Sequence, residues 1–212
     1  ARRPRLVVPG YPHHVTQRGA RRQPTFFSEE DCADYLDLLL QAKAKAGITI
    51  WAYCLMPNHV HLVVVPQSTD SLLRFFREAH RRYTLRVNQR EGWKGHLWQE
   101  RFHSCALDDR HLLAAVRYDE LNPVRAGLCR APADWRWSSV HAHLPAAERW
   151  LAYLGHDDAF DREQLRRHAR SGRPLGDDSF LDELERHTGR RLRAGKRGPK
   201  ARRPLAPYFG DS

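Results

Sequence analysis

Two histidines separated by one residue, His59 and His61, are the part of this sequence best suited to chemistry. They lie in a mostly β-branched apolar stretch between Pro57 and Pro66, a composition typical of a buried strand. Side chains two residues apart on a strand point to the same face, so both imidazoles face one way. Two imidazoles on a rigid strand form half of a metal site. The simpler explanation is that two histidines line a half-exposed sheet face without binding a metal. Other residues must decide between these two explanations.

A tyrosine and an asparagine four residues apart could complete such a site. Tyr118 and Asn122 share one face of a helix expected at about 110–121. A phenol is a good nucleophile toward phosphorus when a metal polarises the phosphate. The carboxamide oxygen of an asparagine suits Mg²⁺ or Mn²⁺. The open alternative is that Tyr118 packs in the core and Asn122 only caps the helix before Pro123.

The elements that must position these groups follow from apolar periodicity and capping residues. A helix begins at the cap Ser28 and ends at Gly47, and further helices are expected at 71–90 and 110–121, the last stopped by Asn122 and Pro123. Strands are expected at 13–19, at 48–55, around His59 and His61, and at 103–107. This order is the split βαβ pattern. We therefore predict an α+β fold with a ferredoxin-like antiparallel sheet and helices on one face.

The charge of the chain points to a polyanionic partner. Among 212 residues, 36 Lys and Arg outnumber 25 Asp and Glu, which gives a formal net charge of +11. A membrane surface is a weaker alternative, because the chain lacks a lysine-rich amphipathic helix and any stretch long enough to span a bilayer. The four cysteines are widely spaced, which argues against a zinc knuckle or a disulfide framework and favours a reduced cytoplasm.

The chain changes character near residue 140. Short helical patterns at about 146–154, 162–170 and 178–187 predict a small helical appendage over 141–189. A basic, flexible tail is expected at 190–212, since residues 190–203 hold eight Lys or Arg and no acid.

Five separate segments resemble the REP-associated tyrosine transposases, a branch of the single-strand HUH transposases. They are YPHHVTQRG at 11–19, MPNHVH at 56–61, GHLWQERF at 95–102, YDELNPVRAG at 118–127 and WSS at 137–139. Several matches in the right order are far more specific than one His-x-His. The resemblance covers about 11–140 and implies that 1–140 is a catalytic domain. It implies Tyr118 as the nucleophile, and His59, His61 and Asn122 as ligands of Mg²⁺ or Mn²⁺.

The implied reaction is a transesterification on single-stranded DNA. Tyr118 attacks a metal-polarised phosphate, so that the 5′ end stays on the enzyme as phosphotyrosine and a free 3′-OH leaves. A returning 3′-OH rejoins the strand without a nucleotide triphosphate, in agreement with the lack of a Gly-x-x-x-x-Gly-Lys-Ser/Thr loop. Tyr83 is the rival nucleophile, although the residue four positions later is Val87, which cannot bind a metal.

The resemblance suggests the REP element as the substrate, a short palindrome that folds as a hairpin. DNA contacts are expected from His14, Gln17, Arg18, Arg77, Arg81, Arg82, Trp98, Arg101, Lys196, Arg197 and Lys200. Trp98 would stack on an unpaired base or belong to the core, and the tail lysines would enter a minor groove or gate the site. We expect a monomer acting in cis, with a dimer as the alternative. A non-catalytic hairpin-binding protein and a metal nuclease that uses water are the competing functions.

Overall fold

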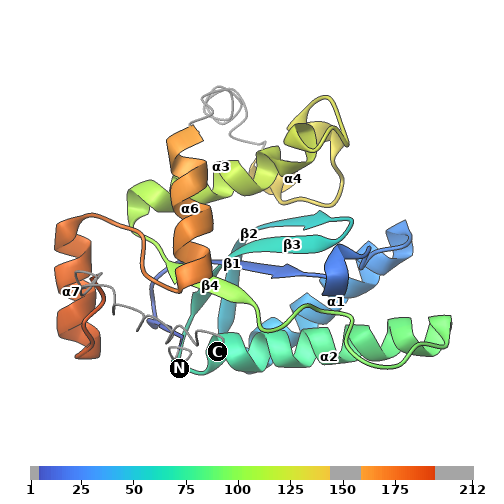
Figure 1. Cartoon of the computed structure of the whole chain (residues 1–212), viewed down its shortest axis with the longest axis horizontal. Coiled ribbons are helices and arrows are strands. Elements are labelled where there is room, and N and C mark those ends of the chain that lie inside the picture. The colour runs from blue at the N-terminus through green and yellow to red at the C-terminus, as the bar shows by residue number, and fades with distance from the viewer. Residues whose placement is uncertain (1–4, 144–158, 194–212) are drawn as a thin grey trace, which may run out of the picture.

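A four-stranded antiparallel sheet lies at the centre of the chain (Figure 1). The computed structural model describes residues 5–143 and 159–193, with side chains from residue 162 onward in the second range. The strand order is β2-β3-β1-β4, which is the order of a split βαβ fold and confirms the predicted class. The strands are β1 (His13–Arg18), β2 (Ile48–Met56), β3 (His59–Pro66) and β4 (His103–Ala106).

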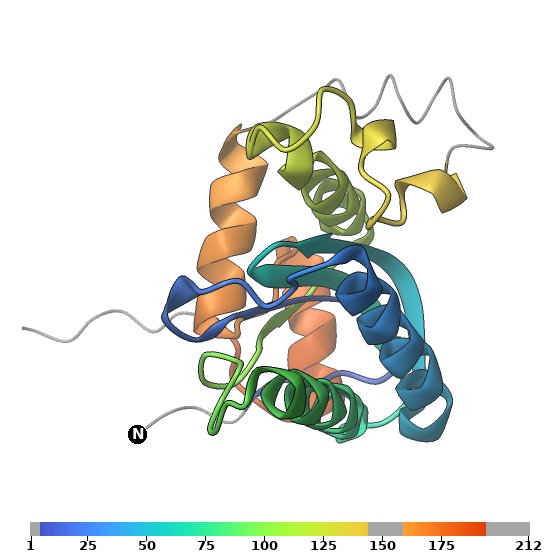
Figure 2. The ribbon, with the colours of Figure 1, turned by 90° about the vertical axis from the view of Figure 1, so that its right-hand side faces the viewer.

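Two long helices, α1 (Glu29–Ala46) and α2 (Ser71–Glu91), cover one face of the sheet (Figure 2). The α1 boundaries agree with the capping residues, because the Ser28 side chain accepts a hydrogen bond from the Asp31 N–H and Gly47 adopts a left-handed φ of 63°. Their apolar stripes pack on every second residue of the strands, including Val15, Leu62 and Val64.

The opposite face is covered as well, so the expectation of helices on one face was incomplete. Helices α3 (Asp109–Arg125) and α6 (Ala159–Ser171) lie on this second face (Figure 2). The reason is that the alternate strand residues are also partly apolar: Ala52, Val63 and Cys105 pack against side chains of both helices. The histidines of β3 therefore lie on the sheet face that packs against α3 and α6.

The predicted end of α3 at Asn122 and Pro123 was wrong. The helix continues through Pro123 to Arg125. A proline removes one intrahelical hydrogen bond, and here it does so in the last turn, where few bonds remain to be lost. The helix end is closed by hydrogen bonds from the Ala126 N–H to the Asn122 carbonyl and from the Leu128 N–H to the Pro123 carbonyl, both 2.9 Å.

The C-terminal helices pack directly on the sheet layer. The patterns predicted at 162–170 and 178–187 form α6 and α7 (Asp178–Thr188), whereas the pattern at 146–154 lies outside the described residues. Leu165 of α6 is buried in the second face. Phe180 and Leu184 of α7 pack against Leu6 and Val8, which precede β1.

The remaining elements are short: η1 (Ala20–Arg22), η2 (Pro132–Asp134) and α4 (Val140–His143). Within 5–143 and 159–193, no helix has the length and apolar character needed to cross a membrane. The four cysteines form no disulfide.

Candidate active site

His59 and His61 lie side by side on β3, on the face that α3 and α6 cover. Their ring centroids are 5.0 Å apart, as the strand geometry predicts for residues two apart. β1 is hydrogen-bonded to β3 in a register that pairs Arg18 with His59 and Thr16 with His61. His14, two residues before Thr16, reaches the same face, and its ring stacks on His61 with centroids 5.6 Å apart.

Each β3 histidine has its Nδ1 atom engaged by a neighbouring oxygen. The Nδ1 of His59 lies 2.7 Å from the Asn58 Oδ1, and the Asn58 amide nitrogen donates to the Arg22 carbonyl at 2.9 Å. The Nδ1 of His61 lies 3.2 Å from the Asp119 Oδ1. These bonds favour the tautomer with the proton on Nδ1, and Nε2 is then the nitrogen available to a metal. Burial is the largest cause that lowers the pKa of both rings, that of His59 to about 3.

A buried ion pair lies beneath these histidines. His14 Nε2 and Asp119 Oδ1 are 3.0 Å apart, and both side chains are inaccessible to solvent. Burial alone would lower the pKa of His14, but the Asp119 charge and hydrogen bond outweigh it and raise that pKa to about 10. Burial would likewise raise the pKa of Asp119, and the charge of His14 with hydrogen bonds from His14 and His61 lowers it instead. The pair is therefore ionised.

Tyr118 is positioned by α3 against the histidine cluster. Its ring packs edge-on to His61, with centroids 5.4 Å apart. The phenolic oxygen accepts a hydrogen bond of 3.2 Å from the Arg166 Nε of α6. A second arginine, Arg125, donates to the Tyr118 carbonyl and lies 5.3 Å from the ring centroid. A cationic donor on the phenolic oxygen stabilises negative charge there.

Most of these side chains line one cleft of about 810 Å³. His59, His61, Tyr118 and Asn122 all border it. Asn122 is only 8% exposed, and its amide nitrogen has no hydrogen-bond partner among the described residues. The Asn122 carboxamide oxygen and the two Nε2 atoms are donor atoms that suit a hard divalent cation with open positions, while the unpartnered Asn122 N–H group could donate to a substrate oxygen.

A second donor set shares His61. His14, His61 and Asp119 each offer one atom within 4.8 Å of the others. Asp119 is fully buried and does not line the cleft, whereas His59, His61 and Asn122 all do. A catalytic ion must keep a position open to its substrate, which favours the cleft-lining set.

The residues expected to bind DNA divide between two clefts and the core. His14, Gln17 and Arg18 line the cleft of Tyr118, although His14 is engaged by Asp119 and Gln17 donates to the Gln99 carbonyl. A second cleft of about 590 Å³ beside α2 is lined by Arg77, Arg81, Trp98 and Arg101, and also by Gln17.

Not all of the expected contacts are available at these clefts. Arg82 does not line either cleft and donates to the Gln41 side chain at 2.8 Å. Trp98 borders the second cleft but is largely buried, and its ring stacks on His80 in the core of the α1–α2 face. Lys196, Arg197 and Lys200 lie outside the described residues.

The rival nucleophile Tyr83 lies in the core between α1, α2 and the sheet. It is 1% exposed, and its hydroxyl donates to the Thr25 carbonyl at 2.6 Å. It is therefore on the opposite side of the sheet from His59 and His61.

Sequence reasoning missed Asp119 and Arg166. Asp119 follows Tyr118 directly, but nothing in the helix pattern distinguishes it from the neighbouring Glu120. Arg166 lies in a helix whose place over the sheet cannot be read from periodicity. Only the packing of α3 and α6 brings Asp119 to His61 and Arg166 to Tyr118.

Comparison with known proteins places this geometry in a family. The model of the family described as "Transposase IS200 like" matches residues 8–120, more than half of the chain. The chain belongs to the IS200-like transposase family. The match contains both β3 histidines and Tyr118, and it ends two residues before Asn122.

Relatives of this IS200-like transposase confirm the resemblance to the REP-associated branch. A REP-associated tyrosine transposase from Escherichia coli (strain K12) is 25% identical over 104 residues, which cover 49% of this chain and 61% of that protein. A relative from Haemophilus influenzae is 26% identical over 106 residues, covering 45% and 60%. The match thus spans about three fifths of each relative.

The fold is shared with a solved structure. It is the structure of a REP-associated tyrosine transposase bound to a REP hairpin, with a TM-score of 0.57 and 23% identity. The match covers 67% of this chain and 84% of the solved chain.

Proposed function

We propose that this IS200-like transposase cuts and rejoins single-stranded DNA through a covalent bond between DNA and Tyr118. The observation that carries the proposal is the shared cleft: the Tyr118 phenol, both β3 histidines and Asn122 border one cavity, and Arg166 donates to the phenolic oxygen. A phenol so placed can attack a phosphate bound between the histidines and the arginines.

His59, His61 and Asn122 would hold a Mg²⁺ or Mn²⁺ ion, which when bound polarises a phosphate oxygen of the substrate. Asn58 and Asp119 keep the Nε2 atoms of the two rings deprotonated and fix the ring orientations. In this arrangement Asp119 orients a metal ligand and is not itself one.

Tyr118 forms the new bond to phosphorus while the bond to the 3′ oxygen breaks, so the DNA 5′ end is retained as a phosphotyrosine. The guanidinium of Arg166 stabilises the phenolate before attack and the same oxygen when a returning 3′-OH displaces it. The cleft also contains Arg18, whose pKa is lowered by burial and by the neighbouring charges of Arg22, Arg166 and Arg170. Such an electropositive cleft attracts a phosphodiester backbone.

The proposed substrate is a REP-type hairpin with an unpaired flank, because the named relative is a REP-associated transposase. The net charge of +11 supports a nucleic-acid partner. We further propose that one chain holds a complete site and acts as a monomer, since His59, Tyr118 and Arg166 of the same chain meet in one cleft.

The decisive experiment uses a labelled single-stranded hairpin with flanking sequence, incubated with Mg²⁺ or Mn²⁺ and separated on a denaturing gel. Wild type should give a protease-sensitive covalent adduct, Tyr118→Phe should give none, and Tyr83→Phe should retain it. Cleavage without an adduct would instead indicate a nuclease that uses water. Tight binding without cleavage by wild type would indicate a hairpin-binding protein.

The two donor sets are separated by metal titration of the intact protein. Asn122→Ala should weaken Mn²⁺ binding at the cleft, whereas Asp119→Asn should weaken it less, because it retains an acceptor for the His61 N–H. Loss of binding in Asp119→Asn with full binding in Asn122→Ala would assign the ion to His14, His61 and Asp119.

A further inference from the structure

A third cleft, of about 210 Å³, lies against the edge strand β4. We name it the β4-edge cleft. Its walls are β4 residues, the loop 172–174 after α6 and the residues 190–192 after α7. The C-terminal walls lie beyond residue 120, where the family match ends.

The β4-edge cleft is strongly basic. Among the residues that the structure describes, six arginines and one histidine line it, and no carboxylate does. Four of these arginines, Arg101, Arg170, Arg173 and Arg191, make no side-chain hydrogen bond or ion pair within residues 5–143 and 159–193. Like charges held together without counter-charges destabilise a fold unless an anion joins them.

A buried hydroxyl in the same cleft also lacks a partner. Ser104 of β4 lines the cleft, is 3% exposed, and its Oγ makes no hydrogen bond among the described residues. Burying a hydroxyl without a partner costs about 1–3 kcal/mol. Ser104 and the arginines line the same cleft, and both hydroxyl and guanidinium groups can donate to the oxygens of a phosphate.

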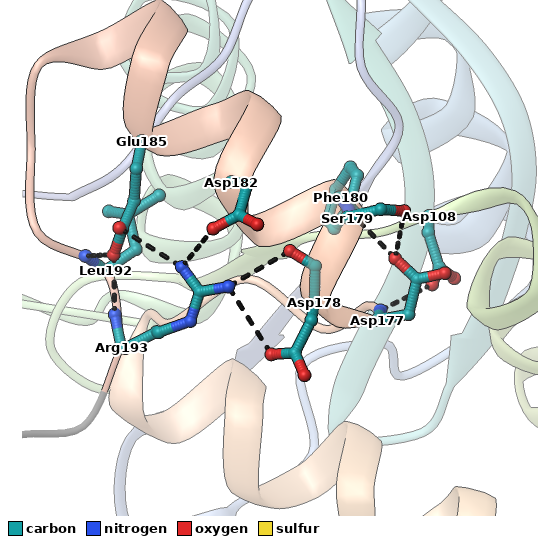
Figure 3. Close-up of polar contacts among 9 residues, drawn as sticks. All are labelled: Asp108, Asp177, Asp178, Ser179, Phe180, Asp182, Glu185, Leu192 and Arg193. Atoms are coloured by element: carbon teal, nitrogen blue, oxygen red, sulfur yellow. Dashed lines mark hydrogen bonds and ion pairs between the residues drawn. The ribbon is translucent and has the colours of Figure 1, made fainter.

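The C-terminal wall is held in place before any ligand binds. Figure 3 shows Glu185 of α7 accepting hydrogen bonds from the backbone N–H groups of Leu192 and Arg193, at 2.6 and 3.1 Å. The Arg193 guanidinium binds Asp182 of α7 at 2.7 Å. These bonds anchor the two residues that follow Arg191, so this end of the wall is ordered by α7.

The β4-edge cleft adjoins the cleft of Tyr118. His103, Ala169 and Arg170 line both cavities. We infer that the β4-edge cleft is a phosphate-binding subsite for the DNA strand that flanks the scissile phosphate, built from β4 and the C-terminal helical segment. This inference rests on the proposed function, and its ligand is the backbone of single-stranded DNA, with no base recognition required.

The test measures binding of single-stranded DNA by the full chain in the Tyr118→Phe background, so that no cleavage occurs. Arg173→Ala with Arg191→Ala should weaken binding, and the slope of log K against log salt concentration should fall by about 1.4, or about 0.7 for each lost phosphate contact. Arg167→Ala with Arg186→Ala is the matched control, since these exposed arginines lie on α6 and α7 outside the cleft. It should leave affinity and slope unchanged.

A second variant probes the hydroxyl. Ser104→Ala should weaken DNA binding without lowering the unfolding temperature, because the Oγ has no partner in the protein. Equal affinity and slope in the Arg173/Arg191 double variant and its control would overturn the inference. The inference would also be overturned if inorganic phosphate bound the cleft while the double variant kept the wild-type salt slope for DNA. The cleft would then bind a free anion and not the DNA backbone.

The outcome is independent of catalysis. A reduced salt slope in the double variant supports the subsite even if wild type forms no covalent adduct. An adduct lost in Tyr118→Phe supports the proposed reaction even if the double variant binds DNA as wild type does.

Discussion

Asn58 makes two hydrogen bonds that together determine which ring nitrogen of His59, a predicted metal ligand, carries the proton. Its amide nitrogen is committed to the Arg22 carbonyl, so its Oδ1 faces the His59 Nδ1. Removing such a partner of a metal-binding histidine commonly costs 10- to 100-fold in metal affinity. We expect Asn58→Ala to weaken Mn²⁺ binding by roughly that factor, as measured by calorimetric titration.

Asn88→Ala is the matched control, since Asn88 donates to the Gly95 carbonyl in an exposed position away from the histidines. Unchanged Mn²⁺ affinity in Asn58→Ala would contradict this role.

His13 predicts a pH dependence of stability. This buried ring donates through Nδ1 to the Tyr11 carbonyl and accepts at Nε2 from the Val8 N–H, so only the neutral ring satisfies both bonds. Burial lowers its pKa from 6.5 to about 4. Below pH 6.5 the unfolded chain therefore takes up a proton that the folded chain excludes, and the stability contributed by His13 is lost as the pH falls from 6.5 to about 4.

Replacement of His13 by glutamine should reduce the slope of the unfolding free energy against pH in this window by up to about 1.4 kcal/mol per unit. Denaturant titrations at several pH values measure the slope, with His96→Gln as the exposed control. A slope equal to that of wild type would show that His13 does not carry this linkage.

At the scale of elements, one ion pair with a buried carboxylate joins the start of α1 to the end of α2. Arg90 binds both carboxylate oxygens of Asp31 at 2.5 and 3.0 Å; the Asp31 side chain is 4% exposed, whereas that of Arg90 is 46% exposed. Removing the arginine leaves a buried carboxylate without its cation. We expect Arg90→Met to lower the free energy of unfolding by about 2 kcal/mol.

The same two helices supply the control. Arg86 and Asp34 form an ion pair of 2.7 Å in which both side chains are about half exposed. Exposed pairs contribute about 0–1 kcal/mol, so Arg86→Met should have a small effect in the same chemical denaturation. Equal losses in both variants would refute the distinction by burial.

Local signals predicted most elements because local physics determines them. Ser28 and Gly47 mark the ends of α1, and the β-branched run after His59 forms β3. The end of α3 was mispredicted because a proline in a last turn costs much less than one in a helix interior. The second helical layer was not predicted. Its apolar partners on the sheet, such as Val63, could be identified from the sequence as strand residues, but the sequence does not show which helices pack on them.

At the scale of the whole molecule, α6 belongs to the same packed unit as the sheet. Leu165 is fully buried in the second face, and the next residue, Arg166, donates to Tyr118. Leu165→Ala should lower the free energy of unfolding by about 3 kcal/mol and also reduce adduct formation. Leu128→Ala, at an exposed position, is the control with an expected change below about 0.5 kcal/mol.

Thermal unfolding and the adduct gel measure the two effects. An independent appendage over 141–189 would instead let Leu165→Ala unfold α6 with no effect on the rest of the chain.

The sequence predicts those parts of the candidate site that depend on residue spacing within a single strand or helix. His59 and His61 follow from strand alternation, and Tyr118 and Asn122 from helical spacing. The supporting contacts required the tertiary structure, because His14, Asp119 and Arg166 come from β1, α3 and α6. No spacing rule relates residues on three separate elements.

The strand order also affects when the site can exist during synthesis. β2 and β3 are adjacent in sequence and form a local hairpin. β1 is synthesised before them, but it can pair only after its neighbours in the sheet, β3 and later β4, have been made. The Tyr118 phenol gains its guanidinium partner only when α6 has been made. A chain still on the ribosome in which Arg166 has not yet been made therefore holds the histidines and Tyr118 without the guanidinium that contacts the phenolic oxygen. The proposed strand cutting would thus require α6 to be synthesised and packed on the sheet.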